Sequence, residues 1–253
     1  MAQGPPPDVC LRGARLSYGG RPVFRDLDLT LESGTWTGLL GESGVGKSSL
    51  LRFLAGRSDG VAEADSMTCS DGLPLFGRIS YMAQQDLLMP WLTVLDNVTL
   101  GYRLRDRSHR APAVIARARG LLAAVGLGGQ TGNLPASLSG GMRQRVALAR
   151  TLMEDRPVVL MDEPFSALDA ITRFRLQNLA AELLAERSVL LVTHDPLEAL
   201  RLCHRVLVLA GQPARLERPL EISGTPPRPS DDPDVLIQQG ALLARLAEGR
   251  AAA

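Results

Sequence analysis

The sequence predicts an α/β fold built around a mainly parallel β-sheet. Short apolar runs alternate along the chain with segments of helical periodicity, which is the pattern of strands joined by crossover helices. The run at 158–161 is apolar at every position, which is typical of a parallel strand buried on both faces. The chain has 253 residues, of which 45% are apolar, enough for one large domain or a domain with a subdomain.

An antiparallel β region is expected ahead of that sheet. Leu27, Leu29 and Leu31 alternate with polar residues, which indicates a strand with one buried face. This strand and the segment 9–17 together form the predicted N-terminal β region. The stretch 58–77 is polar and turn-rich, and its pattern does not predict a particular structure.

Strands and helices alternate through the rest of the chain. The predicted elements are strands at 79–83, 158–161, 189–192 and 205–209 and helices at 111–125, 140–154, 170–186 and 235–246. In the third of these helices, apolar residues lie near one face: Ile171, Phe174, Leu179 and Leu183.

Length and composition limit the organisation and the partners. We expect a domain over 8–212, with a helical subdomain at about 86–155, and then a Pro-rich linker and helical tail over 213–253. Lys and Arg number 28 against 27 Asp and Glu, so no global basic field indicates a nucleic-acid partner. Three scattered cysteines indicate a reduced protein, and we see neither a secretory signal nor an apolar run long enough to span a membrane.

A glycine-rich run follows an apolar stretch at 36–40 and leads into a helical pattern. Glycines let the backbone approach a phosphate closely, and the helix N-terminus adds partial positive charge there. Lys47 can reach the β- and γ-phosphates of a nucleotide, and the Ser48 hydroxyl can ligate Mg²⁺. Because strand, turn and helix occur in this order, we expect a nucleotide site made of Gly41, Glu42, Ser43, Gly44, Val45, Gly46, Lys47, Ser48 and Ser49.

Two acidic residues follow the apolar strand at 158–161. In a parallel sheet, ligands bind at the C-terminal ends of the strands. Asp162 is placed there to hold Mg²⁺, and Glu163 to activate a water for attack on the γ-phosphorus. Solvated acids at a strand end are the alternative, and the pair alone does not decide between the two.

A second turn that opens a helix is a further candidate anion site. Ser139, Gly140 and Gly141 would present backbone N–H groups at a positive helix end. A plain N-cap, in which Ser139 bonds its own first turn, is the alternative and by itself the commoner arrangement.

Taken in order, these motifs resemble the nucleotide-binding subunit of an ATP-binding cassette (ABC) transporter over roughly 18–205. The resemblance rests on motifs and on single residues. The matching motifs are Walker A at 41–48, the signature at 138–145, Walker B at 158–163 and the D-loop at 166–169. The matching residues are the adenine-stacking aromatic Tyr18, the Q-loop glutamine Gln84 and the switch histidine His194, whereas Met142 stands where the signature usually has glutamine.

The resemblance implies a P-loop NTPase fold with a mainly parallel core sheet, an antiparallel N-terminal region and a helical subdomain that carries the signature. It implies ATP and Mg²⁺ as cofactors and head-to-tail pairing with a second copy of the chain. ATP held by Lys47 and Ser48 of one copy would then be closed by Ser139, Gly140 and Gly141 of the other.

By the same resemblance, each site residue has an implied role. Glu163, His194 and Gln84 would be catalytic, and Asp169 would serve the dimer interface. The neighbouring Gln85 leaves a one-residue alternative for the Q-loop open. The implied magnesium ligands are Ser48, Gln84 and Asp162.

The stretch 84–98 resembles importer subunits for nitrate, sulfonates, taurine and pyrimidine precursors of thiamine. Its Pro90–Trp91 pair marks this subgroup, and within it the resemblance of 81–98 favours a pyrimidine precursor. An exposed Trp91 would suit contact with a membrane permease through the Gln84–Trp91 region, although a locally buried aromatic is the alternative.

The implied function is ATP hydrolysis that powers import of a small solute. The subunit would lie peripherally on the cytoplasmic face of the cell (inner) membrane and depend indirectly on a periplasmic or extracellular solute-binding protein. The alternatives are a stand-alone exporter ATPase and a non-transport cassette ATPase that acts on nucleic acid or ribosomes.

Overall fold

The computed structural model describes residues 5–105 and 110–251, and these form two compact units. Unit 1 contains Met1–Ile79, Pro157–Glu163 and Leu184–Ala253. Unit 2 contains Ser80–Arg156 and Pro164–Leu183. Strand β6 (Ile79–Met82) begins in unit 1 and continues into unit 2.

The large sheet of unit 1 has the strand order β10-β9-β3-β8-β7. Its four central strands run parallel and are almost wholly buried, so the prediction of a mainly parallel core sheet is confirmed. Two short strands, β10 and β11, pair antiparallel with β9. The bounds are β3 (Trp36–Gly41), β7 (Val158–Asp162), β8 (Ser188–Val192), β9 (Arg205–Ala210), β10 (Arg215–Leu216) and β11 (Leu220–Glu221).

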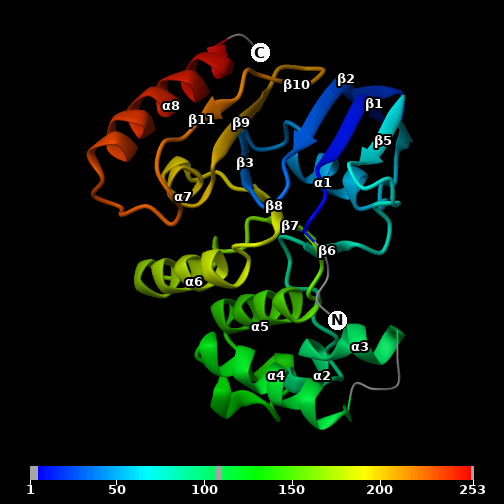
Figure 1. The fold of residues 1–253 in the computed structure, drawn as a ribbon, viewed down its shortest axis with the longest axis vertical. Helices are drawn as coiled ribbons and strands as arrows, with labels where there is room; N and C mark the ends of the chain where they lie inside the picture. Colours follow the sequence, from blue (N-terminus) through cyan, green and yellow to red (C-terminus); the bar gives the residue numbers. More distant parts are fainter. Residues whose placement is uncertain (1–4, 106–109, 252–253) are drawn as a thin grey trace. The chain divides into compact units, whose positions relative to one another are not determined.

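Helices pack against this sheet within unit 1, as Figure 1 shows. Helix α7 (Pro196–Leu202) contacts β3 and β9 and also packs against α8 (Pro233–Ala251). Helix α1 (Lys47–Leu54) follows β3 directly and contacts β3 and β7. Its Phe53 meets Phe24 edge-to-face, with ring centroids 5.9 Å apart.

The N-terminal sheet of unit 1 is antiparallel, as predicted. Strand β1 (Val9–Tyr18) pairs with β2 (Arg21–Leu31) along its length. On its other edge β1 pairs with β4 (Val61–Glu63) and β5 (Ser66–Cys69). These two strands come from the stretch whose structure the sequence did not predict, because their residues are mostly exposed and show no alternation of buried and polar positions.

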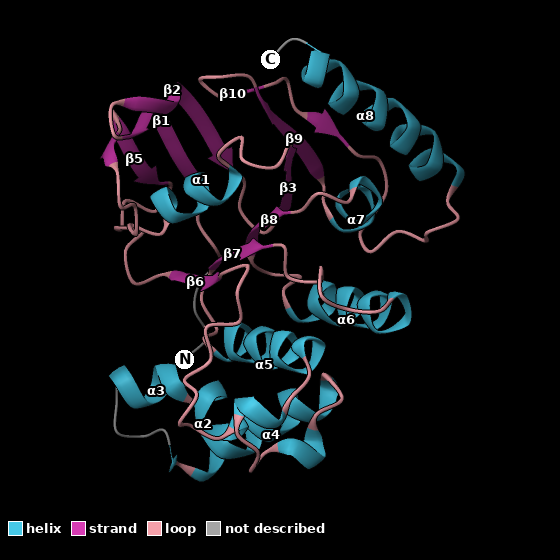
Figure 2. Ribbon diagram, turned by 180° about the vertical axis from the view of Figure 1, so that it is seen from behind, coloured by secondary structure: helices cyan, strands magenta, loops and turns pink. Residues whose placement is uncertain are grey.

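Unit 2 is helical and is organised around α5 (Gly140–Met153), which packs against α2 (Val94–Val98) and α4 (Pro112–Ala124) (Figure 2). Thr93 caps α2, because its hydroxyl accepts a hydrogen bond from the Asp96 N–H at 3.1 Å. The remaining helices are α3 (Leu100–Arg105) and α6 (Ala170–Leu183), with short 3₁₀ turns at Gly128–Gln130 and Pro135–Ser137.

Helix α6 differs from its prediction. It ends at Leu183, and it buries Leu176, Ala180 and Ala181. Ile171 is 69% exposed and Phe174 is 43% exposed, so the larger apolar side chains at the start of the helix lie outside the core. The packing face is formed by Leu176, Gln177 and the two alanines, none of which belongs to the predicted apolar set.

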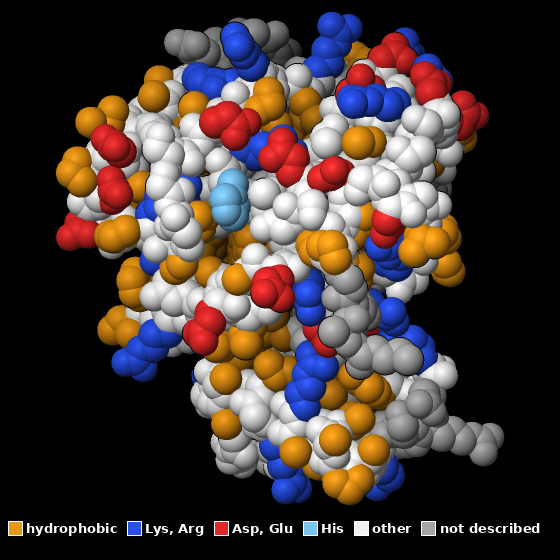
Figure 3. All heavy atoms as spheres, viewed as in Figure 1, with side chains coloured by type: hydrophobic (Ala, Val, Ile, Leu, Met, Phe, Trp, Pro, Cys, Tyr) orange, Lys and Arg blue, Asp and Glu red, His pale blue; other side chains and the backbone are white. Residues whose placement is uncertain are grey.

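The C-terminal segment is built into unit 1 rather than extending from it. Ala214 bridges to Phe24, and β10 and β11 join the large sheet. Helix α8 then packs on α7. None of the described helices is both long and apolar enough to cross a membrane. On the face drawn in Figure 3, basic and acidic side chains are both present, in keeping with the net charge of +1.

Candidate nucleotide site

Close backbone packing in unit 1 requires two glycines of the phosphate loop. A Cβ on Gly41 would lie 2.3 Å from the Leu209 carbonyl oxygen, and one on Gly46 would lie 2.6 Å from Val23 Cγ1. Both residues also have positive φ, at 151° and 117°. Gly46 is the N-cap of α1, so the helix begins at Lys47 with its positive end at the loop.

The Lys47 side chain folds back along the loop. Its Nζ donates to the carbonyl oxygens of Gly41 and Glu42 at 2.7 and 2.8 Å. Burial lowers the pKa of this amine, whereas the negative charges of Glu163 and Asp162 oppose that shift. The ammonium group is therefore held beside the loop by acceptors that a phosphate oxygen can replace.

Asp162 and Ser48 form an oxygen-rich pair at the end of β7. Asp162 is 3% exposed, and its carboxylate is hydrogen-bonded to the Ser48 side chain. Burial raises the pKa of Asp162, and the hydrogen bond from Ser48 opposes that rise. A carboxylate and a hydroxyl are the ligand types that Mg²⁺ takes beside nucleotide phosphates, so these residues fit the ion.

Glu163 and His194 lie together because β7 and β8 are parallel neighbours, with Asp162 in register with Val192. The Glu163 N–H donates to the Val192 carbonyl oxygen at 2.9 Å. The His194 Nδ1 lies 3.3 Å from Glu163 Oε2. Glu163 has φ 48°, a left-handed conformation uncommon for this residue type and often found at functional sites. The position of the Glu163 carboxylate is thus set both by the backbone conformation of this residue and by the contact with His194.

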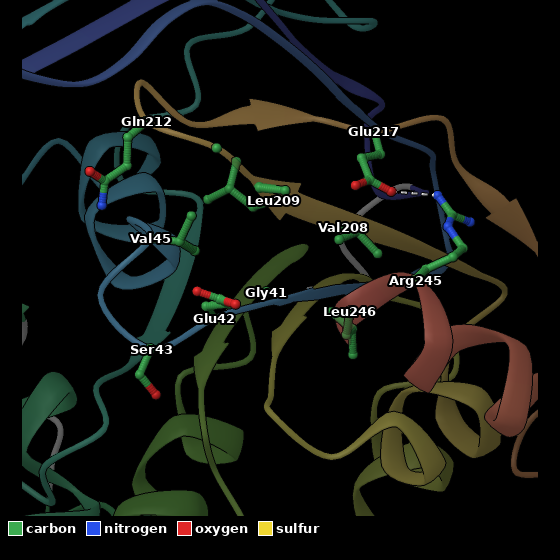
Figure 4. Close-up of a pocket in the computed structure, with 12 residues that line it drawn as sticks. Gly41, Glu42, Ser43, Val45, Val208, Leu209, Gln212, Glu217, Arg245 and Leu246 are labelled. Carbon is green, nitrogen blue, oxygen red and sulfur yellow. Dashed lines mark hydrogen bonds and ion pairs between the residues drawn. The ribbon is translucent and has the colours of Figure 1, made fainter. Parts of the chain in front are cut away.

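A pocket opens beside the first residues of the phosphate loop. Figure 4 shows Arg245 of α8 directed toward Glu217, and the Arg245 Nη2 to Glu217 Oε2 distance is 2.8 Å. The C-terminal helix thus contributes to the wall of this pocket, which the sequence did not predict. The lining residues are Gly41, Glu42, Ser43, Val45, Val208, Leu209, Ala210, Gly211, Gln212, Glu217, Arg245 and Leu246.

Tyr18 ends β1, next to a tight turn of two glycines. A Cβ on Gly60 would lie 2.9 Å from the Tyr18 ring, so one part of the ring packs against that backbone. Its hydroxyl is buried without a hydrogen-bond partner among the described residues. Its predicted contact with adenine stays a prediction.

The signature turn lies in unit 2 and is largely exposed. Ser139 is the N-cap of α5, and its Oγ accepts from the Met142 N–H at 3.3 Å. Gly141 lies against the D-loop, because a Cβ there would be 3.2 Å from the Ala167 carbonyl oxygen. The capping interpretation of Ser139 therefore holds in the single chain.

Asp169, at the end of the D-loop, caps α6. Its Oδ1 accepts from the Thr172 N–H at 3.0 Å, and this hydrogen bond lowers the pKa of the carboxyl group. The D-loop and the signature turn are thus both helix starts, set close together in unit 2.

The loop that follows Gln84 is attached to α5 by two arginines that the sequence analysis did not single out. Arg143 Nε donates to Asp86 Oδ2 at 3.0 Å. Arg150 donates to the carbonyl oxygens of Asp86 and Leu87 at 2.6 and 2.9 Å. Their spacing of seven residues on one helix was the signal available in the sequence. Gln84 and Gln85 are both exposed, so the one-residue alternative stays open.

Trp91 is 71% exposed, which contradicts the alternative of a buried loop aromatic. The fully buried Asn97 fixes the loop beneath it. Its Nδ2 donates to the carbonyl oxygens of Met89, Leu92 and Thr93, each at 3.1 Å. The loop is therefore rigidly held while the indole faces outward.

A family model described as "ABC transporter" matches residues 24–166. This chain belongs to the ABC transporter family. It is 48% identical over 204 residues to an uncharacterized ABC transporter ATP-binding protein of Haemophilus influenzae, covering 79% of this chain and 81% of that protein. It is 46% identical over 232 residues to the aliphatic sulfonates import ATP-binding protein SsuB 1 of Rhodococcus jostii, covering 89% and 88%.

The ABC cassette fold is also found in solved structures. The dimeric structure of the bacterial cassette MJ0796 matches with a TM-score of 0.75 at 27% identity and covers 86% of this chain and all of that chain. A post-hydrolysis state of MJ0796, bound to ADP and Pi, matches with a TM-score of 0.74. The predicted ABC cassette fold, ATPase class and importer-type ATP-binding subunit are confirmed.

Proposed function

We propose that this ABC subunit hydrolyses ATP between two head-to-tail copies and thereby drives import of an aliphatic sulfonate. The proposal of ATP hydrolysis rests on the contact between Glu163 and His194 in unit 1. Glu163 and Asp162 also lie near enough to Lys47 for their charges to act on its amine. The sulfonate part rests on the relatives, since the cassette does not itself contact the solute.

Glu163 is the general base in this proposal. Its left-handed backbone and the adjacent His194 aim the carboxylate, which accepts a proton from the attacking water. His194, whose side chain is 62% exposed, reaches outward to the γ-phosphate side of that water. Gln84, or its neighbour Gln85, would add a contact from the Q-loop.

Lys47 binds the β- and γ-phosphates after exchanging its two carbonyl acceptors for phosphate oxygens. Ser48 and Asp162 would hold Mg²⁺. The chemistry that Mg²⁺ supplies when bound there is neutralisation of charge on the phosphate oxygens. The backbone N–H groups of the loop complete the cradle.

The second copy closes the nucleotide with its signature turn. Ser139 and Gly140 are exposed in the single chain, and the packing of Gly141 on Ala167 makes the turn and the D-loop one continuous surface. Only a closed dimer offers the γ-phosphate both half-sites. ATP therefore favours closure by its differential affinity for the two states.

For the solute, we propose an aliphatic sulfonate in place of the pyrimidine precursor that the sequence favoured. Relatives that cover most of this chain, at 46% and 40% identity, carry aliphatic sulfonate import in their names. A solute-binding protein would deliver the sulfonate, and the exposed Trp91 region would dock the permease. The subunit would then lie on the cytoplasmic face of the membrane.

The hydrolytic proposal is tested with Glu163→Gln. Turnover should fall by at least about 100-fold because the general base is lost. ATP binding should persist, and size-exclusion chromatography should show an ATP-dependent dimer. Glu186→Gln, an exposed glutamate after α6, is the matched control and should behave like the unmodified chain. Undiminished turnover in Glu163→Gln would refute the assigned role.

The solute is tested with vesicles that contain this subunit and the permease encoded with it. The accompanying binding protein should stimulate ATP hydrolysis when loaded with an aliphatic sulfonate. The same protein incubated with a hydroxymethylpyrimidine should not. Stimulation by the pyrimidine alone would restore the solute favoured by the sequence.

A further inference from the structure

Arg228 is a buried cation in the C-terminal segment, with 3% of its surface exposed. Its guanidinium group donates to five main-chain carbonyl oxygens from two parts of the chain. Two acceptors, Leu200 and Cys203, lie at the end of α7, both at 2.8 Å. The other three acceptors are Ser223 at 2.6 Å, Ile222 at 3.0 Å and Gly224 at 2.8 Å.

The main chain on either side strengthens the same attachment. The Arg228 N–H donates to the Arg201 carbonyl oxygen at 2.9 Å. In return, Arg201 Nε donates to the Arg228 carbonyl oxygen at 3.0 Å. The last carbonyls of a helix lack partners within the helix and carry partial negative charge. Arg228 therefore satisfies and neutralises the C-terminal end of α7.

The opposite end of α7 lies at the switch histidine. Asp195, the residue after His194, caps the helix by accepting from the N–H groups of Leu197 and Glu198 at 3.0 and 3.4 Å. The helix has seven residues and so spans only about 10 Å. A displacement of its C-terminal end is consequently transmitted to His194 without an intervening loop.

The side of α7 is pressed against the strand that leads into the phosphate loop. A Cβ on Gly38 would lie 3.1 Å from Cys203 Sγ and 3.2 Å from Ala199 Cβ. Gly38 precedes Gly41 by three residues on β3. Helix α7 is thus fixed by Asp195 at its start, by β3 along its side and by Arg228 at its end.

We propose that Arg228 is a positioning residue for ATP hydrolysis, which acts through α7 to hold His194 against Glu163. The C-terminal segment is then part of the hydrolytic machinery, although it contributes no residue to the phosphate loop. This inference rests on the proposed roles of Glu163 and His194.

Two substitutions test the proposal. Arg228→Gln removes the charge and most donors, whereas Arg228→Lys keeps the charge but concentrates its donors at one point, which cannot serve carbonyls on both sides. Arg228→Gln should lower kcat by about 10-fold, because a shift of His194 by a fraction of an ångström should cost less than the roughly 100-fold of a 1 Å misplacement. The KM for ATP should change by less than about threefold, since the binding contacts of the phosphate loop remain. The kcat of Arg228→Lys should lie between those of the unmodified chain and Arg228→Gln. If Arg228→Gln does not fold, Arg228→Lys takes its place in every comparison.

A double-mutant cycle with His194→Ala separates positioning from general destabilisation. In the His194→Ala background, the further change at position 228 should lower kcat by less than about twofold, because its target is already gone. Arg218→Gln, which removes an exposed arginine of the same segment that does not line the pocket, is the control and should keep kcat. Thermal unfolding of each variant is recorded in parallel.

The outcomes distinguish the two proposals. Suppose that His194→Ala lowers kcat, and that the change at position 228 lowers kcat by the same factor with His194 present and with His194 replaced. The positioning role of Arg228 is then overturned, and the proposed function stands. If kcat is unchanged in a folded Arg228 variant, the positioning role is likewise overturned. If His194→Ala hydrolyses ATP at the full rate, the proposed role of His194 fails and this inference fails with it.

Discussion

The two halves of the proposed ATP site differ in how much of their structure exists in one chain. In unit 1, Lys47 and Asp162 are less than one tenth exposed, and both have hydrogen-bond partners. In unit 2, Ser139 and Gly140 are exposed, and the Ser139 side chain caps its own helix. One half is therefore preorganised for phosphate. The other half presents an exposed turn, which in our proposal closes on the nucleotide of a partner molecule.

The largest effect is expected from breaking the preorganised half. Lys47→Ala should lower turnover by at least about 100-fold, because it removes the charged donor to the transferring phosphate. Nucleotide binding should weaken as well, which fluorescence of a labelled ATP analogue can measure. Arg218→Gln, an exposed arginine outside the pocket lining, serves as the control. Normal turnover in Lys47→Ala would contradict the assignment.

A second, smaller loss is expected from the exposed half. A Cβ on Gly140 would meet only Arg143 Nη2, at 4.0 Å, so an aspartate fits there. Gly140→Asp should reduce turnover because its carboxylate would repel a phosphate brought by the partner. Stability of the single chain should be kept or raised by about 0.3–1 kcal/mol, since an acid suits a helix N-terminus. Calorimetry measures the stability of the variant. A Gly140→Asp chain that is clearly less stable than the unmodified chain would contradict the expectation.

The chemical reactivity of Lys47 sharpens the same comparison. It is the only lysine of the sequence, so an amine-directed reagent can modify only this side chain and the N-terminus. Burial lowers the pKa of its amine, so the reactive neutral form is more abundant below pH 10.5 than for an ordinary lysine. Labelling should begin at lower pH than for free lysine, and ATP should block it. In the Lys47→Arg variant only the N-terminal amine can react, so this variant measures the background labelling. Labelling of Lys47 that is the same with and without ATP would contradict the expectation.

The smallest effect on hydrolysis is expected from Trp91→Ala. The indole is mostly exposed, and Asn97 holds the loop without it. Turnover and thermal stability of the isolated subunit should therefore be unchanged. Binding to permease-containing vesicles, measured by co-sedimentation, should weaken because an exposed aromatic anchor is lost. Unaltered vesicle binding would remove Trp91 from the proposed docking surface.

The phosphate loop, the acid pair and the alternation of strands and helices could be predicted from the sequence, because each depends on local chemistry. Glycine positions, apolar runs and polar strand ends are all visible without a structure. The contact of Glu163 with His194 required the parallel register of β7 and β8, which no local pattern encodes. The integration of the C-terminal segment was missed for a similar reason. Two-residue strands have no periodicity, and a single buried Arg228 resembles any surface arginine in sequence.

Mixing two impaired variants tests most directly whether the two halves of an ATP site come from different copies of the chain. In a mixed dimer of Lys47→Ala and Gly140→Asp chains, one site carries both defects and the other carries neither. We predict that ATP hydrolysis, which is reduced in each variant alone, rises when the two are combined. Differently tagged chains allow the mixed dimers to be purified and assayed. Purified mixed dimers without activity would contradict a site shared between two copies.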